Sequence, residues 1–290
     1  MALFCDFENV ALGVRDAKYD KFDIGKVLER LLVKGSIVVK KAYCDWERYK
    51  AFKATMHEAA FELIEIPHVR QSGKNSADIR MVVDALDLCY TKAHVDTFVI
   101  ISGDSDFSPL VSKLRENNKA VIGVGVKQSS SDLLISNCDE FIYYDDLVRE
   151  EKAKAKRPRR KPQPKAAKPA AAEGEPKSGE ELKPSDEVKP EEEAKPEQED
   201  KTAQAVDLVM STLDALVAER GEDEKIWGSM IKQTLKRRHP GFNESYYGFK
   251  SFNSLLEEAQ ARRLISLERD EKSGGYVVWP AAHEPVAIEG

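Results

Sequence analysis

Histidine and cysteine are scarce in this 290-residue chain, which has five histidines and four cysteines. Cys5, Cys44, Cys89 and Cys138 lie about 40 to 50 residues apart in apolar surroundings, and no C-x-x-C pair is present. This spacing argues against a zinc site, and equally against the disulfide framework of a small secreted domain. We therefore expect four buried free thiols.

Long apolar runs and a uniform positive charge are also missing. No stretch reaches the roughly 18 consecutive apolar residues of a membrane span, and the start MALFCDFENV meets Asp6 too early for a signal peptide. We expect a cytoplasmic protein without a membrane partner. A formal charge of -6 and a pI near 5.6 exclude a uniformly basic coat for nucleic acid, although charges of one sign can still gather locally.

Residues 1–148 alternate short β-branched apolar runs with amphipathic segments. The expected strands are ALFC, SIVVKKAYCDW, ELIEIPHV, TFVIIS, AVIGVGV and EFIYYDDL. The expected helices are FDIGKVLERLLVKG, AFKATMHEAAF, ADIRMVVDALDLCYTK and SPLVSKLRENN. This alternation is typical of an α/β fold whose parallel sheet has helices on both faces. Asp23 can cap the first helix, and Pro109 fits the first turn of the last one.

Residues 149–200 lose this periodicity. Eight prolines between Pro158 and Pro196 interrupt any helix, which predicts a disordered linker. Residues 152–168 carry nine Lys or Arg and no acid, so this half could hold a polyanion, whereas residues 173–200 carry twelve acids and four lysines. About 50 flexible residues reach roughly 40 Å, so the flanking modules are expected to move independently.

Residues 201–280 return to a regular pattern of three amphipathic segments followed by a hairpin, RLISLERDEKSGGYVVWP. Gly274 and Gly275 would supply the turn of this hairpin. Three helices and a two-stranded ribbon predict a small winged-helix domain of the α+β class. Residues 281–290 are left as a tail.

Four aspartates stand at the ends of predicted elements. Asp6 ends ALFC, Asp104 and Asp106 follow TFVII, and Asp78 opens the helix after the third strand. Ligands of open parallel sheets bind beyond the carboxyl ends of the strands, so we expect these acids at one edge. Carboxylates about 4 Å apart repel by roughly 4 kcal/mol at an effective dielectric near 20. Mg²⁺ or Mn²⁺ would relieve this repulsion and could activate water for phosphodiester hydrolysis.

Each acid taken alone has a simpler explanation. Aspartate and serine after a strand often cap a helix, and Asp106 or Ser108 could cap the one that begins near Pro109. Asp84, six residues beyond Asp78, faces about 120 degrees away on a helix and is expected at the surface or behind the site. The convergence of separate segments favours the functional interpretation.

Three blocks of the first half resemble the signature blocks of the NYN domain, a branch of the PIN-like metal-dependent nucleases. They are DFENV at 6–10, KNSADIRMVVDAL at 74–86 and FVIISGDSDFSPLVSKLRE at 98–116. The resemblance covers residues 1–148, and the SGDSDF block is its most specific part. Family members cleave RNA, usually single-stranded, with Mg²⁺ or Mn²⁺. The resemblance therefore implies a PIN-like fold and a metal-dependent ribonuclease.

The NYN resemblance also implies a set of site residues. The metal-binding acids would be Asp6, Asp78, Asp104 and Asp106. Asn9 would hold a metal-bound water or a phosphate, and Ser102 would orient the loop. Lys74 could contact phosphate. Two alternatives stay open: a catalytically inactive RNA-binding adaptor, and a metal-dependent phosphatase or nucleotide hydrolase.

The segment KIWGSMIKQTLKRRHPGFNESYYGFKSFNSLLEEA, at 225–259, resembles the core of the OST-HTH domain, also called LOTUS. The resemblance covers about residues 203–280 and implies a module that binds RNA, in some members G-rich RNA, or docks on a protein. The predicted RNA contacts are Lys232, Arg237, Arg238, Tyr246 and Lys250. Phe242 and Phe252 are expected in the core. The preferred RNA and the oligomeric state are left open by the sequence.

Overall fold

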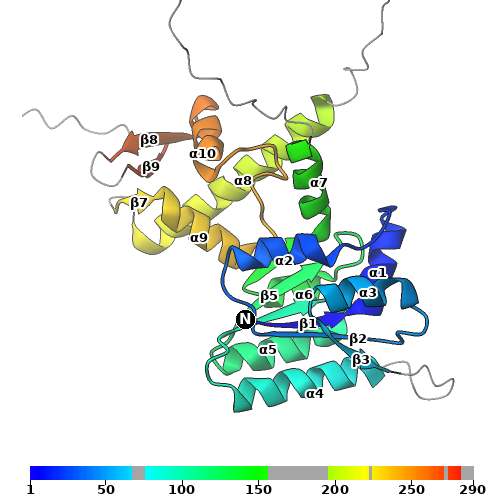
Figure 1. Ribbon diagram of the computed structural model, residues 1–290. Helices are drawn as coiled ribbons and strands as arrows, with labels where there is room; N and C mark the ends of the chain where they lie inside the picture. The colour runs from blue at the N-terminus through cyan, green and yellow to red at the C-terminus, as the bar shows by residue number, and fades with distance from the viewer. Residues whose placement is uncertain (67–75, 156–194, 222–223, 271–273, 282–290) are drawn as a thin grey trace, which may run out of the picture.

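The structure is a computed structural model that describes residues 1–66, 76–155, 195–221, 224–270 and 274–281. Its N-terminal module is a six-stranded, fully parallel sheet in the order β3-β2-β1-β4-β5-β6 (Figure 1). The strands are β1 (Ala2–Asp6), β2 (Val39–Cys44), β3 (Glu62–Glu65), β4 (Thr97–Ile101), β5 (Ala120–Gly125) and β6 (Glu140–Tyr143). The predicted α/β class is confirmed.

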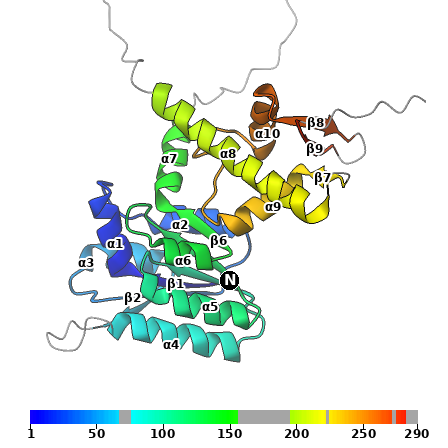
Figure 2. The same cartoon turned by 180° about the vertical axis from the view of Figure 1, so that it is seen from behind.

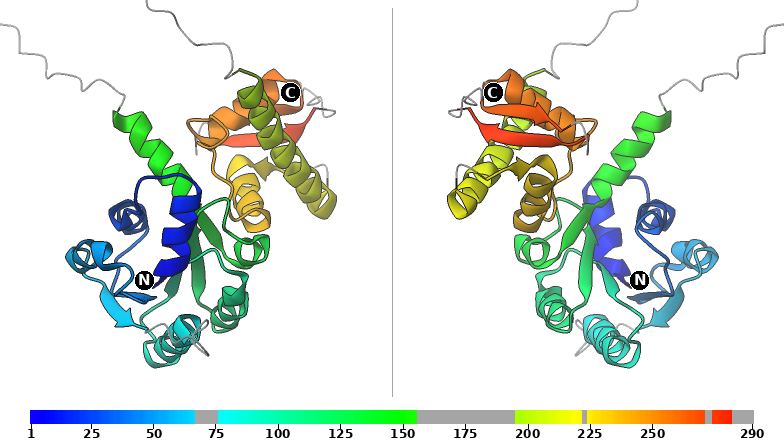
Figure 3. Two further views of the ribbon diagram at one scale, coloured as in Figure 1. Left: turned by 90° about the vertical axis from the view of Figure 1, so that its right-hand side faces the viewer. Right: turned by 90° about the vertical axis from the view of Figure 1, so that its left-hand side faces the viewer.

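Helices cover both faces of this sheet, as the edge-on views of Figure 3 show. One face carries α1 (Phe7–Asp16), α2 (Ile24–Leu32), α3 (Lys50–Glu58) and α7 (Tyr144–Ala155). The other face carries α4 (Ser76–Thr91), α5 (Ser108–Glu116) and α6 (Asp132–Asn137). Each layer closes its own apolar core against the sheet.

The strand β1 shows why two cores form. Successive side chains of a strand point to opposite faces. Leu3 and Cys5 lie in one core, Ala2 and Phe4 lie in the other, and all four are fully buried. A strand that is buried on both faces has a continuous apolar sequence, which is the pattern that predicted it.

The sheet order reverses between β1 and β4. From β1 the chain builds outward through β2 and β3 on one side, and later through β4, β5 and β6 on the other. Such a switch point leaves a crevice at the carboxyl ends of the two central strands. Cys5 pairs with Ile101, so Asp6 and Ser102 leave the sheet beside each other at this crevice.

Several local predictions are confirmed. The Asp23 side chain caps α2 by accepting a hydrogen bond from the Gly25 N–H at 2.9 Å, and Pro109 lies in the first turn of α5. All four cysteines are buried and free. The strand expected for EFIYYDDL is wrong beyond Tyr143, because Tyr144 begins α7. The helices α1 and α6 were not predicted.

The predicted linker, residues 149–200, is too long at both ends. Residues up to Ala155 continue α7, and α8 (Lys195–Arg220) begins at Lys195. Alanine, lysine and glutamate are strong helix formers, and the proline at the second position of α8 falls where a missing N–H is tolerated. Residues 156–194, Lys74 and residues 282–290 lie outside the described residues. No helix in the described parts of the chain has the length and apolarity needed to cross a bilayer.

The C-terminal module is a small α+β unit. Its helices α8, α9 (Gly228–Arg238) and α10 (Phe252–Ala261) share one core with a three-stranded antiparallel sheet in the order β7-β9-β8. The strands are β7 (Ile226–Trp227), β8 (Ile265–Arg269) and β9 (Tyr276–Pro280). Gly274 has a φ of 68° in the hairpin, and Phe242 and Phe252 are buried, as expected.

The two modules contact each other at the β6 edge of the parallel sheet (Figures 1 and 2). The Phe141 N–H donates to the Pro240 carbonyl at 3.0 Å, and the Asn243 side-chain amide donates to Asp146 at 2.8 Å. An edge strand leaves N–H groups unpaired, and Pro240 satisfies one of them. The modules are therefore docked, in contrast to the independent movement expected of a flexible tether.

Candidate active site

The carboxyl edge of β1 and β4 holds the acids that the sequence singled out. Asp6 closes β1, caps α1, and is only 7% exposed. Asp104 follows β4 and is half-buried, whereas Asp106 is exposed on the short 3-10 helix η1 (Ser105–Phe107). Asp78 lies in the first turn of α4. Because α4 runs back along the sheet before β4, its amino end lies at the same edge (Figure 1).

These acids lie close enough for the charge of one to raise the pKa of another. Burial first, and then the negative charges of Asp78 and Asp104, raise the pKa of Asp6 to about 7, although the hydrogen bonds from Ser102 and Asn9 lower it. The pKa of Asp78 is also raised, first by burial and then by the charges of Asp104 and Asp106. The rim is therefore an electrostatically crowded site that favours a cation.

Ser102 joins two of the acids. Its fully buried hydroxyl donates to Asp6 Oδ2 at 3.0 Å and accepts from the Asp104 N–H at 3.2 Å. This is the loop-orienting role expected of it. Asp104 Oδ1 in turn accepts from the Asp106 N–H at 3.0 Å and caps η1.

The simpler capping explanation holds for Asp6 at α1 and Asp104 at η1, rather than for Asp106 or Ser108. The cap position of α5 is Phe107, and no side chain caps this helix. The Ser108 hydroxyl is buried without a hydrogen-bond partner among the described residues. Asp106 and Ser108 therefore do not cap α5, and Asp104 has a structural role in η1 that uses one of its two oxygens.

Asn9 anchors α1 to the loop after β4. Its side-chain oxygen accepts from the Gly103 N–H at 2.9 Å, and its own N–H donates to Asp6 Oδ1 at 3.4 Å. The oxygen is committed to the loop, so the amide NH₂ is the group left for a ligand. An NH₂ group donates to phosphate or water and does not ligate a cation.

Glu8 is the rim residue that the sequence reasoning missed. Its negative charge is among the causes that raise the pKa of Asp78, and its carboxylate pairs with Arg48 at 3.1 Å. Glu8 lies two residues after Asp6 in the motif DFENV, and this closeness in sequence could have indicated that it lies at the rim.

The rim offers only oxygen donors to the expected metal ion. In the described parts of the chain, no three His, Cys, Asp or Glu side chains are grouped so that they could hold one metal ion. Mg²⁺ usually binds through one or two carboxylates and keeps several waters, with substrate phosphates completing its octahedron. The oxygen-only rim fits this open mode of binding and does not fit a closed all-protein cage.

Three of the predicted RNA contacts lie on the outside of the C-terminal module. Lys232 pairs with Glu244 at 2.7 Å, which offsets its charge. Arg237 and Lys250 are exposed. They do not line the cavity that the other two contacts share.

Arg238 and Tyr246 line a cavity between the two modules. The Arg238 guanidinium donates to the Ser211 carbonyl at 2.9 Å. Lys127 Nζ of the N-terminal module lies 3.6 Å from the centroid of the Tyr246 ring. Arg149 and Lys201 also lie near this ring, at 5.1 and 5.7 Å from its centroid, so the expected base platform already has cations beside it.

Comparisons with known proteins add the following. The family model of the NYN domain matches residues 1–145. An uncharacterized protein of Methanocaldococcus jannaschii is 29% identical over 121 residues, which is 41% of this chain and 47% of the relative, so the match spans about half of that protein. The crystal structure of a protein of unknown function from Vibrio parahaemolyticus aligns with 28% identity over 50% of this chain and 93% of its own, with a TM-score of 0.45.

Proposed function

The chain belongs to the NYN domain family of PIN-like nucleases through residues 1–145, and from this premise we propose that it is a metal-dependent ribonuclease. The observation that supports the proposal most is the electrostatic coupling of Asp6, Asp78 and Asp104 at the switch point of the sheet. Crowded carboxylates with only oxygen donors suit Mg²⁺ or Mn²⁺. The proposed reaction is hydrolysis of phosphodiester bonds in single-stranded RNA.

Each part of the rim has a place in this reaction. Asp6, Asp78, Asp104 and Asp106 would hold the ion, one or two of them directly and the others through its bound waters. When bound, the ion supplies a more acidic water and stabilises charge on the phosphate. Ser102 fixes the Asp6 carboxylate relative to the loop that carries Asp104. The Asn9 NH₂ is placed to donate to a phosphate oxygen, because its oxygen is already held by Gly103.

The C-terminal module is proposed to hold RNA for the rim. Its exposed Arg237 and Lys250 are available for phosphate contacts, which supply affinity without sequence selection. Docking on a protein partner is the other use that its resemblance to OST-HTH domains suggests.

A cleavage assay on a labelled single-stranded RNA tests the proposal. We expect the full chain to cleave RNA in the presence of Mg²⁺ or Mn²⁺. Cleavage should stop when a chelator removes the ion. Asp104→Asn should lower the rate by about 100-fold or more, because it removes a charge from the ion site. RNA affinity should change little in this variant.

The matched control is Asp87→Asn, an exposed aspartate of α4 away from the rim. It should cleave at the wild-type rate. Cleavage that persists in chelator, or an Asp104→Asn variant with full activity, would remove the ion site from the mechanism.

A second candidate is an RNA-binding adaptor without catalysis. The salt bridges and cation contacts that already engage Glu8 and Tyr246 would not prevent this role, since RNA binding needs no metal ion. Retained RNA binding with no cleavage in either ion would identify the adaptor. Including single-stranded DNA and a simple phosphomonoester in the same assay separates a ribonuclease from a phosphatase.

A further inference from the structure

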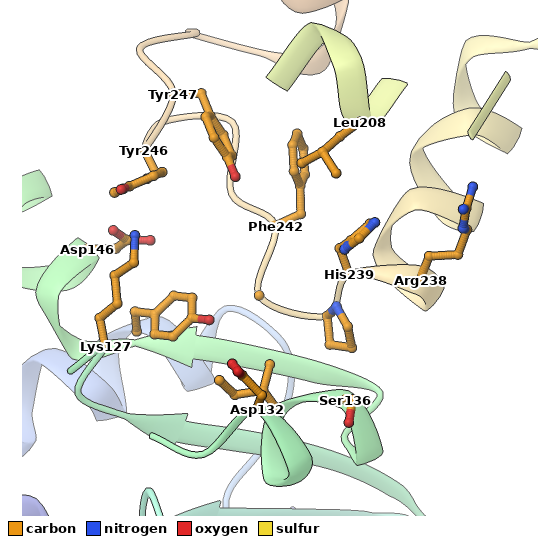
Figure 4. A pocket seen from close by; sticks show the side chains of 14 residues that line it. Lys127, Asp132, Ser136, Asp146, Leu208, Arg238, His239, Phe242, Tyr246 and Tyr247 are labelled. Atoms are coloured by element: carbon orange, nitrogen blue, oxygen red, sulfur yellow. The ribbon is translucent and has the colours of Figure 1, made fainter. Parts of the chain in front are cut away.

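A cavity of about 350 Å³ lies between the two modules (Figure 4). Its lower wall consists of the loop after β5, the helix α6 and the end of β6. Its upper wall consists of Leu208 of α8 and the segment that follows α9. The volume lies within the range of about 300 to 1,000 Å³ that is usual for ligand sites.

The walls of this cavity are held at fixed positions. The Phe141–Pro240 and Asn243–Asp146 hydrogen bonds join the modules beside it. Gly241 lies so close to Tyr143 that a Cβ at this position would be 2.7 Å from the tyrosine oxygen. Only glycine allows such a close approach of the backbone. The cavity is therefore a built feature of the docked protein.

Polar groups with room for a further hydrogen bond or ion pair line the cavity. Within the part of the chain that the structure describes, Lys127 contacts the Tyr246 ring but pairs with no carboxylate, and the Tyr143 hydroxyl makes no hydrogen bond. Burial and the charges of Asp132 and Asp146 raise the pKa of Tyr143 to about 12, so this hydroxyl keeps its proton and remains a donor. Burial and Arg238 lower the pKa of His239, which keeps a neutral ring with one donor and one acceptor.

The remaining lining suits an unpaired base. Tyr143, Phe242, Tyr246 and Tyr247 provide aromatic surface, and Figure 4 shows Lys127 pointing toward Tyr246 from the opposite wall. Aromatic rings next to a lysine bind the flat base and the phosphate of one nucleotide. Of the two carboxylates in the lining, Asp146 is paired with Arg149 at 2.8 Å, whereas Asp132 adds a negative charge to the lower wall.

One loop of the chain connects a wall of the cavity with the carboxylate rim. Lys127 begins this loop, and the Ser131 N–H at its other end donates to the Gly103 carbonyl at 2.9 Å. Gly103 has no room for a Cβ because Ser129 packs directly on it. Gly103 immediately precedes Asp104. A strand lying across the rim can therefore follow this loop into the cavity.

We infer that the cavity between the modules takes one unpaired nucleotide of the RNA strand on which the rim acts, with its base against the tyrosines and its phosphate at Lys127. This inference rests on the proposed function, because it assigns the same RNA to both places. It makes the docked C-terminal module a part of the substrate site.

Binding of a fluorescein-labelled single-stranded RNA of about 20 nucleotides, measured by anisotropy in an Asp104→Asn background, tests the inference. Tyr143→Phe removes only a hydroxyl, and Lys127→Gln removes only a charge. Each should weaken binding by about fivefold or more. The controls Tyr90→Phe and Lys92→Gln change exposed residues at the end of α4, which do not line the cavity, and should bind like the parent. Equal melting temperatures would show that all four variants fold.

Photocrosslinking gives a readout that a purely structural role would not change. RNA carrying 4-thiouridine should crosslink to peptides that contain Tyr143 or Tyr246. Crosslinks found only elsewhere, together with unchanged affinity in both cavity variants, would overturn the inference. A free mononucleotide that competes as strongly as the strand would also overturn it, by assigning the cavity to a small ligand.

The failure of this inference can be distinguished from failure of the proposed ribonuclease activity. If the wild type cleaves RNA and the cavity variants cleave it with the same KM, the ribonuclease activity is supported and the nucleotide site in the cavity is overturned. If RNA crosslinks to the cavity but is not cleaved in Mg²⁺ or Mn²⁺, the proposed ribonuclease activity is contradicted and RNA binding in the cavity is supported.

Discussion

At the scale of single residues, Asp6 is the rim acid whose ionisation is most strongly affected by its surroundings. It is 7% exposed, and its pKa rises to about 7 although Ser102 and the Asn9 N–H both donate to it. A carboxyl group with a raised pKa binds its proton more tightly in the folded chain than in the unfolded chain. Its contribution to stability is therefore complete below the unfolded pKa and is lost as the pH rises through about 7.

Replacing Asp6 by asparagine should remove this pH dependence. Without divalent ions, the wild type should lose about 3 kcal/mol of unfolding free energy relative to Asp6→Asn between about pH 5 and pH 8, because each pH unit below the raised pKa corresponds to about 1.4 kcal/mol. Urea denaturation of both proteins at several pH values measures the difference. Cleavage of RNA should be lost in the variant.

Asp16→Asn is the control for this change, since Asp16 is an exposed residue of α1 away from the rim. Its pH profile should parallel that of the wild type. Added Mg²⁺ should stabilise the wild type more than Asp6→Asn at the higher pH. Parallel profiles for wild type and Asp6→Asn would contradict the assigned ionisation.

At the scale of secondary-structure elements, α4 sets the position of Asp78 through a second aspartate. Asp84 accepts hydrogen bonds from Tyr43 Oη at 2.9 Å and Lys41 Nζ at 3.2 Å, both on β2, and from Arg80 Nε at 3.0 Å. Burial opposes ionisation, but these partners lower its pKa overall. Asp84 thus lies behind the site, as expected, and joins α4 to the sheet.

The loss of this anchor should destabilise the N-terminal module. Asp84→Asn should lower the free energy of unfolding by about 2 kcal/mol, because hydrogen bonds to a largely buried charge are lost. Chemical denaturation at neutral pH measures this value. The cleavage rate should fall less than in Asp78→Asn, since only the helix position changes.

Asp87→Asn serves again as the control, because Asp87 lies on the exposed side of the same helix. It should unfold within about 0.5 kcal/mol of the wild type. An Asp84→Asn variant as stable as this control would mean that the network around Asp84 does not hold α4.

At the scale of the whole molecule, docking depends on a short segment that reaches β6. Pro240 supplies a carbonyl to the edge strand, and the next residue, Gly241, rests against the Tyr143 ring. The docked surface leaves the cavity beside it. The modules can approach this closely because residue 241 is a glycine, which has no Cβ to meet the Tyr143 ring.

Adding one methyl group at this point should loosen the docking. Gly241→Ala places a Cβ within 3.0 Å of three Tyr143 atoms, and such overpacking costs about 1 to 3 kcal/mol. We expect a larger radius of gyration in small-angle X-ray scattering, with unchanged helix content in circular dichroism.

A second substitution makes this test sharper. Tyr143→Ala in the Gly241→Ala background removes the clash and should return the radius of gyration toward the wild-type value. Gly35→Ala is the control, because its Cβ would meet only a Met1 atom at 3.9 Å. If Gly241→Ala scatters like Gly35→Ala, docking does not depend on this contact.

The differences between prediction and structure follow from the length and composition of the segments. Strands buried on both faces and long amphipathic helices have clear patterns, so most of the N-terminal module was predictable. Short elements such as α6 and β7 contain too few residues to show a period. The pattern of the segment at β6 and α7 predicts one strand, because its Tyr, Phe and Ile residues favour β-structure.

The sequence by itself determined the parallel sheet, the two modules and the gathering of Asp6, Asp78, Asp104 and Asp106 at one edge, because these depend on local patterns and on the geometry of parallel strands. Only the tertiary structure decided that Asn9 turns its oxygen to Gly103, that Glu8 reaches the rim, and that the C-terminal module docks on β6 and encloses a cavity. Such contacts join residues far apart in the chain, and their distances depend on how whole elements pack rather than on any spacing along the sequence.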